Sequence, residues 1–191
     1  MNKETQQFIQ DDEFKVLYEN LHKKFNPIKP NINPENLQAI GLIIIKFQRL
    51  EMNILTFVRI LANLGDDQKL ADILTAKASF GSLLVILSSL AIEREFRQMK
   101  ELKLLINKSG QAEKIRNQIV HSVWSSEPRL KKNISIQKGI KYQSETYEKG
   151  ELRLVAETVD NLDTAMAALC HDYMDYCYNH GITLKGVKYI D

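Results

Sequence analysis

Hydrophobic residues after Pro34 recur at intervals of three and four, the spacing of one face of an α-helix. The run comprises Leu37, Ile40, Ile43, Ile44, Phe47, Leu50, Ile54, Phe57, Val58 and Leu61. Because so many positions in this run are apolar, the surface that faces the core should be wide. We therefore predict a long helix that begins at Pro34 and ends near Gly65, followed by a short helix capped by an aspartate.

Three further segments carry the same helical spacing. A first helix is predicted from about Lys3 to Phe25, followed by a Pro-containing linker up to residue 33. Another is predicted from Ser79 to Leu105, where the polar stretch Asn107 to Gly110 breaks it. A motif helix should then begin at about Gln111. The apolar residues that it is expected to bury are Ile115, Ile119, Val120 and Val123.

The last predicted helix has the most regular pattern, with steps that alternate between three and four. Its apolar residues are Leu152, Val155, Val159, Leu162, Met166, Leu169, Tyr173 and Tyr176, and Gly181 should end it. A seam of this kind requires another helix, either within the bundle or from a second protomer. Period-two alternation occurs around Lys138-Gly139, where Ile134, Ile136, Ile140 and Tyr142 predict a small β-hairpin.

Together these patterns predict an all-α fold, an up-and-down helical bundle with a small β-hairpin after the motif helix. The 191 residues, 44% of them hydrophobic, suit a single domain over 1–191. Within it, residues 1–33 would form the N-terminal helix and linker, and residues 34–191 the bundle.

Neither a signal peptide nor an apolar run of about 20 residues is visible, so we expect no membrane association. Cys170 and Cys177 lie seven apart on one predicted helix, about 10 Å from each other, which is too far for a disulfide. A reducing, cytoplasmic location fits these thiols best. His171 and His180 lie nearby, but the four residues match no established zinc spacing, so we predict no metal and no cofactor.

Positive charge is concentrated in one part of the chain. Between Arg94 and Lys141 there are 12 Lys or Arg residues and 4 Glu, whereas the whole chain has a net charge of only +2. Local basicity of this kind favours binding to a phosphodiester backbone. Solvated helix faces and a lysine-guarded edge strand would give the same distribution, so the pattern alone leaves both interpretations open.

The basic region contains the candidate site, Arg116-Asn117-x-x-x-His121. Histidine can take a proton from a ribose 2′-hydroxyl or return one to a leaving oxygen, because it titrates near neutral pH. The planar, permanently charged guanidinium of arginine suits the oxygens of a phosphate. On an ideal helix Asn117 and His121 share a face, whereas Arg116 lies about 140° from His121. Either the arginine bends round, or the helix is distorted, or a second copy of the chain supplies the missing group.

With this motif between a long basic helix and a tyrosine-lined helix, the chain resembles the HEPN superfamily, over roughly Pro34 to His180. The resemblance implies a homodimeric, metal-independent endoribonuclease that cuts RNA by 2′-hydroxyl attack and leaves a cyclic phosphate. It assigns catalytic roles to Arg116 and His121, and makes Asn117 an orienting polar group. Proteins of this kind commonly serve as toxins or phage-defence effectors.

One position departs from the pattern of members that are controlled by a nucleotidyltransferase antitoxin. Those members have a tyrosine two residues after the histidine, whereas this chain has Val123. That mode of control is therefore not expected, although another cognate antitoxin or regulatory protein remains open as a partner. A second interpretation also stays open, in which the chain is a non-catalytic helical module that binds RNA, a nucleotide or a protein, and the motif only holds helices together.

Overall fold

The computed structural model describes residues 34–63, 78–124, 129–134, 141–146 and 150–184, together with Val16 and Thr75. The chain divides into two compact units, Met1–Asn31 and Ile32–Asp191, and all elements discussed below belong to the second unit. The predicted helix over Lys3 to Phe25, the short helix after Gly65 and the turn at Lys138-Gly139 lie outside the described residues.

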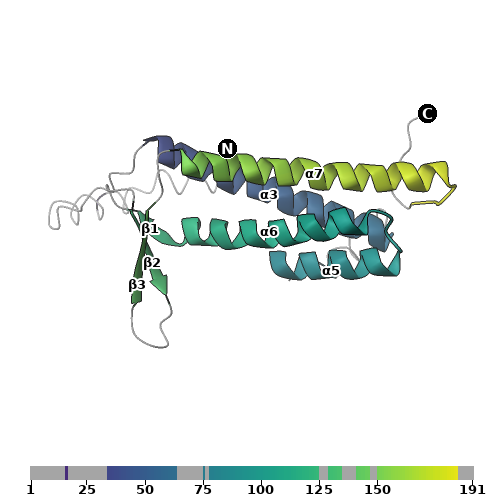
Figure 1. Ribbon diagram of the computed structural model, residues 1–191, viewed down its shortest axis with the longest axis horizontal. Coiled ribbons are helices and arrows are strands. Elements are labelled where there is room, and N and C mark those ends of the chain that lie inside the picture. The colour runs from purple at the N-terminus through teal and green to yellow at the C-terminus, as the bar shows by residue number, and fades with distance from the viewer. Residues whose placement is uncertain are drawn as a thin grey trace. The chain divides into compact units, whose positions relative to one another are not determined.

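Four helices make up the described bundle (Figure 1). They are α3 (Pro34–Ala62), α5 (Phe80–Glu93), α6 (Met99–Val120) and α7 (Glu151–Asn179). The long helices after Pro34 and before Gly181 are confirmed. Gly181 adopts a left-handed backbone (φ 66°) directly after α7 ends, as expected of a glycine that terminates a helix. Ser79 caps α5, because its hydroxyl accepts a hydrogen bond from the backbone N–H of Ser82.

Packing contacts fix the direction of each helix. The start of α3, the end of α6 and the start of α7 meet in one cluster of buried residues, so α6 runs antiparallel to α3 and α7. The members of this cluster are Ala39, Ile43, Ile119, Leu152 and Ala156. At the other end, Arg94 follows α5 and its Nε donates to the carbonyl of Leu61 near the end of α3. The helices α5, α6 and α7 therefore alternate in direction, while α3 and α5 run the same way.

The main core lies where α3, α5, α6 and α7 come together. Its fully buried side chains include Phe47, Leu50, Ile54 and Phe57 from α3, Leu87 from α5, Leu102 from α6 and Met166 from α7. Phe47 also packs against Phe80, with ring centroids 4.6 Å apart. Because apolar side chains from all four helices are buried here, this core is what holds the bundle together.

The prediction for the middle of the chain is wrong in two places. The expected break at Asn107 to Gly110 is absent, since α6 runs unbroken through it. Instead the chain breaks at Arg94 to Gln98, where Glu95 has a left-handed backbone (φ 50°) and the N–H of Phe96 reaches back to the carbonyl of Ala91. The predicted third helix is thus two helices, α5 and the first half of α6.

The end of the motif helix also differs from the prediction. It ends at Val120, and Val123 lies in strand β1 (Ser122–Trp124) rather than on the helix. Val120, expected to be buried, is 41% exposed. Strand β2 (Arg129–Ile134) pairs antiparallel with both β1 and β3 (Lys141–Thr146), and the order is β1-β2-β3.

No described helix combines the length and the apolar character that crossing a bilayer would require.

Candidate functional site

The candidate motif occupies the C-terminal end of α6. His121 is the residue that caps this helix, with φ −95° and ψ 12°, and its backbone N–H donates to the carbonyl of Asn117 at 3.1 Å. Its side chain is exposed. The imidazole is therefore accessible to a ligand from solvent, and among the described residues only its backbone hydrogen bond to Asn117 holds His121 in place.

Arg116 lies five residues earlier, about 1.4 helical turns, and is half-buried. Its guanidinium carbon is 4.8 Å from the centroid of the Phe47 ring on α3, within the range of a cation–π contact. Its Nη1 donates to Oδ1 of Asn117 at 2.7 Å. The ring and the amide together hold the guanidinium in one orientation, because each restricts a different part of the planar group.

The structure brings Arg116 and Asn117 together but leaves His121 apart from them. Among the described residues, the His121 side chain forms no hydrogen bond with the side chain of either. Arg116 extends toward α3, whereas His121 is on the solvent side, in agreement with the separation of about 140° expected for positions five apart. One chain therefore presents the imidazole to solvent, while the half-buried guanidinium packs on the Phe47 ring of α3.

Comparison with protein families, characterised proteins and solved structures finds no match for this chain. The motif must be interpreted from its own chemistry.

A second polar group, which the sequence analysis did not identify, joins α3 to α7. Asp163 is only 1% exposed and accepts a hydrogen bond from Asn53 Nδ2 at 2.5 Å, while Arg49 Nη2 lies 2.9 Å from its other oxygen. Lys46 Nζ lies 2.7 Å from Asp160, and the hydrogen bond between them holds the pKa of that carboxyl below its usual value of 3.8. The signal in the sequence was an aspartate pair three residues apart beside the apolar seam of the last helix. This cluster connects two helices of the bundle.

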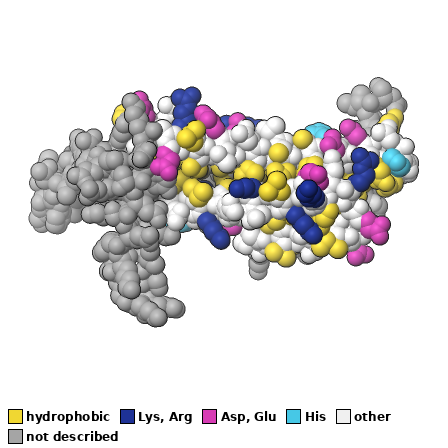
Figure 2. All heavy atoms as spheres, in the orientation of Figure 1, with side chains coloured by type: hydrophobic (Ala, Val, Ile, Leu, Met, Phe, Trp, Pro, Cys, Tyr) yellow, Lys and Arg dark blue, Asp and Glu magenta, His cyan; other side chains and the backbone are white. Residues whose placement is uncertain are grey.

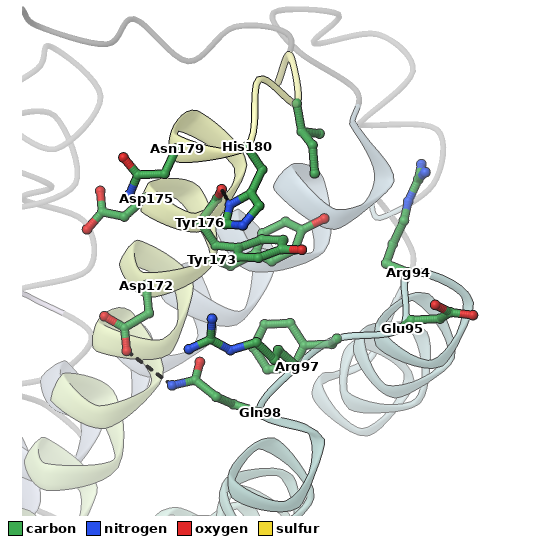
Figure 3. A pocket seen from close by; sticks show the side chains of 12 residues that line it. Arg94, Glu95, Arg97, Gln98, Asp172, Tyr173, Asp175, Tyr176, Asn179 and His180 are labelled. Carbon is green, nitrogen blue, oxygen red and sulfur yellow. Dashed lines mark hydrogen bonds between the residues drawn. The ribbon is translucent and has the colours of Figure 1, made fainter.

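The far end of the bundle from His121 contains a cavity of about 530 Å³, here called the terminal cleft (Figure 3). Its lining residues come from the turn between α5 and α6 and from the last turns of α7: Arg94, Glu95, Phe96, Arg97, Gln98, Asp172, Tyr173, Asp175, Tyr176, Asn179, His180 and Ile182. The rings of Tyr176 and His180 are 4.1 Å apart, and the guanidinium carbon of Arg97 is 5.7 Å from the Tyr176 ring. Flat groups thus line a cavity that opens to solvent.

Side chains on opposite sides of the terminal cleft approach each other. Gln98 Nε2 donates to Asp172 Oδ2 at 3.3 Å, and Figure 3 shows Arg97 facing the layer formed by the two tyrosines. Burial raises the pKa of Tyr173 to about 12, an effect increased by its hydrogen bond with Cys177. The Tyr173 hydroxyl therefore stays protonated at neutral pH and acts only as a hydrogen-bonding group.

Cys170 and Cys177 form no disulfide, as predicted, and both are buried, while His171 and His180 are exposed. Burial raises the pKa of the Cys170 thiol to about 12, so it is unreactive at neutral pH. Within the described part of the chain, no group of three or more His, Cys, Asp or Glu side chains is gathered closely enough to hold a metal ion.

Proposed function

We propose that this protein is a metal-independent endoribonuclease that resembles the HEPN superfamily. The observation that carries the proposal is the exposed imidazole of His121 at the end of α6, one turn beyond the hydrogen-bonded pair of Arg116 and Asn117. Exposure is what a group must have if it is to exchange protons with a bound RNA. The guanidinium of Arg116 carries the positive charge that such a reaction needs, although within one chain it lies apart from the imidazole.

In this reaction the 2′-oxygen of a ribose attacks the adjacent phosphorus and the 5′-oxygen of the next nucleotide leaves. One imidazole accepts the proton of the 2′-hydroxyl and an imidazolium donates a proton to the leaving oxygen. The products end in a 2′,3′-cyclic phosphate and a 5′-hydroxyl. Arg116 neutralises the charge that develops on the non-bridging oxygens, and Asn117 orients Arg116.

The reaction needs two proton-transfer groups, but each motif supplies a single histidine. A second copy of the chain, paired so that two motifs face one cleft, supplies the other. Pairing also resolves the separation of Arg116 and His121 within one chain, because each guanidinium then serves the imidazole of its partner. The proposed enzyme is for this reason a homodimer.

The test is cleavage of a fluorescent RNA in the presence of EDTA. His121→Ala and Arg116→Ala should each lose cleavage by about 100-fold or more, which is the usual contribution of an acid–base group or of a charge-stabilising donor. The matched controls are His171→Ala and Arg153→Ala, which replace the same residue types at exposed positions on α7. Cleavage that persists in both motif variants, or that stops with EDTA, contradicts the proposal.

A biological role as a toxin or phage-defence effector follows from the same resemblance. Expression of the wild-type chain should slow bacterial growth, and expression of His121→Ala at equal protein level should not. Equal growth of the two cultures would exclude toxicity under these conditions. A cognate antitoxin or regulatory protein would be sought by rescue of growth.

One observation favours a second candidate function. The guanidinium of Arg116 packs on the Phe47 ring of the neighbouring helix α3, as expected if the motif only stabilises helix packing. In that case the protein is a non-catalytic helical module that binds RNA, a nucleotide or a protein partner. Arg116→Ala would then lower stability while cleavage would be absent from the wild type as well.

A further inference from the structure

A stripe of polar residues follows the outer side of α6 over its whole length. The α6 stripe consists of Lys100, Lys103, Asn107, Gln111, Lys114, Gln118 and His121. On an ideal helix these positions fall within a sector of about 80°, opposite the face that buries Leu102, Ser109 and Ala112. All members are exposed except Gln118, which is half-buried.

The charge on the α6 stripe has one sign. Lys100, Lys103 and Lys114 are cationic, whereas the two acidic residues of α6, Glu101 and Glu113, lie about 80° or more beyond its edges. Figure 2 shows Lys and Arg side chains spaced along the length of the bundle. A row of separated lysines with neutral amides between them suits a strand of regularly spaced phosphates better than it suits a single anion.

The α6 stripe joins the two sites described above. It ends at His121 and begins at Lys100, two residues after Gln98 of the terminal cleft. At 1.5 Å per residue the distance along it is about 30 Å. A strand bound along α6 would therefore have one end at the candidate catalytic group and the other at the cleft.

The chemistry of the terminal cleft suits a base rather than a phosphate. Three carboxylates line it, from Glu95, Asp172 and Asp175, against the two guanidinium groups of Arg94 and Arg97, so a phosphate gains little there. Flat aromatic and guanidinium faces stack on any base, and carboxylates accept hydrogen bonds from exocyclic amino groups.

We propose that single-stranded RNA lies along the α6 stripe, with its phosphates on Lys100, Lys103 and Lys114 and an unpaired, amino-bearing base in the terminal cleft. This inference rests on the proposed ribonuclease function, since it describes how that substrate is held. It also predicts binding in the absence of cleavage, because the stripe and cleft are separate from the reacting atoms.

The first experiment measures binding of a fluorescent 2′-O-methyl oligoadenylate of about 12 nucleotides, within the range of about 4 to 16 that single-strand sites cover. This probe has no 2′-hydroxyl to attack, so binding is measured whether or not the protein cleaves RNA. Replacing Lys100, Lys103 and Lys114 by Gln should lower the slope of log affinity against log salt by about 2, at roughly 0.7 per phosphate contact. Lys108→Gln is the matched control, since Lys108 is an exposed lysine about 100° from the centre of the stripe. It should change the slope little.

The second experiment tests the base in the cleft. Tyr176→Leu keeps an apolar side chain but removes the ring, and should weaken oligoadenylate binding by about fivefold or more. An abasic 2′-O-methyl strand of equal length should bind wild type and Tyr176→Leu equally. Tyr178→Leu, an exposed tyrosine on the same helix that does not line the cleft, should bind both probes as wild type does. Circular dichroism verifies the fold of each variant.

Equal slopes of log affinity against log salt for the triple-lysine variant and wild type would contradict the proposal that phosphates bind along the α6 stripe. Equal oligoadenylate affinity of Tyr176→Leu and wild type would contradict the proposal that a base binds in the terminal cleft. Tighter binding of a duplex than of the single strand would contradict both parts of the proposal. Binding as expected together with no RNA cleavage would instead leave this inference standing and reject the ribonuclease proposal.

Discussion

Replacement of Arg116 by alanine has a structural cost that can be worked out from its contacts. The change removes the cation–π contact with Phe47, worth about 1 kcal/mol at a half-buried site. It also removes the hydrogen bond to Asn117, worth about 1 kcal/mol for a partly exposed charged donor. Arg116→Ala should therefore lower the free energy of unfolding by about 2 kcal/mol, which corresponds to a fall in Tm of about 4 to 8 °C for a chain of this size.

Urea denaturation followed by circular dichroism measures this loss, and a double-mutant cycle isolates its main part. In the Phe47→Leu background, Arg116→Ala should cost about 1 kcal/mol less than in wild type, because the ring is already gone. Arg153→Ala is the control. Among the described residues Arg153 pairs with Glu157 alone, both side chains are largely exposed, and its loss should cost less than about 0.5 kcal/mol.

A coupling free energy near zero between Arg116 and Phe47 would refute this reasoning, since it would mean that the guanidinium does not rest on the ring. The cycle also guides the cleavage assay. If a variant loses about 2 kcal/mol of stability but stays folded at the assay temperature, its loss of cleavage can be assigned to lost catalysis. If it unfolds, the loss of cleavage cannot be assigned in this way.

Three further outcomes are expected. Arg49→Ala should lower the free energy of unfolding by about 1 to 3 kcal/mol in urea denaturation, because Asp163 is buried and would lose its cation; a loss below 0.5 kcal/mol would show that the pair is not stabilising. Because Lys46 lowers the pKa of Asp160, their pairing stabilises the fold above the usual pKa of 3.8, and this stabilisation is lost as the pH falls through the lowered pKa. The difference in Tm between wild type and Lys46→Met should therefore shrink between about pH 6 and pH 2. A constant difference would contradict the pairing. The Cys170 thiol should react with a thiol reagent at pH 8 far more slowly in the native protein than in urea, and equal rates would show that it is not buried.

The positions of the long helices were predictable, but the break between α5 and α6 was not. The stretch from Asn107 to Gly110 contains residues that disfavour helix, yet packing overrides that preference. Ser109 is completely buried, and Gly110 lies against α5, where an added Cβ would be 3.9 Å from Leu84. The real break places a left-handed backbone at Glu95, a residue type that gives no such signal.

For the candidate site, helical geometry predicted the angular separation of Arg116 and His121 but not what Arg116 would contact. Phe47 is 69 positions away in the sequence, and their contact depends on how α3 packs against α6. The same is true of Asp163, whose partners Arg49 and Asn53 lie on α3. The terminal cleft escaped prediction because it is built from a turn and a helix end about 75 residues apart in the chain.

Because α6 is unbroken, a tilt at its N-terminal end displaces its C-terminal end. A straight helix of 22 residues is about 33 Å long, so a tilt of about 3° around the terminal cleft would displace His121 by roughly 1.7 Å. Acid–base chemistry is sensitive to errors of about 1 Å in the placement of its groups. Under the proposed function, a small tilt of α6 at the α5–α6 turn would therefore shift the imidazole far enough to change the rate of RNA cleavage.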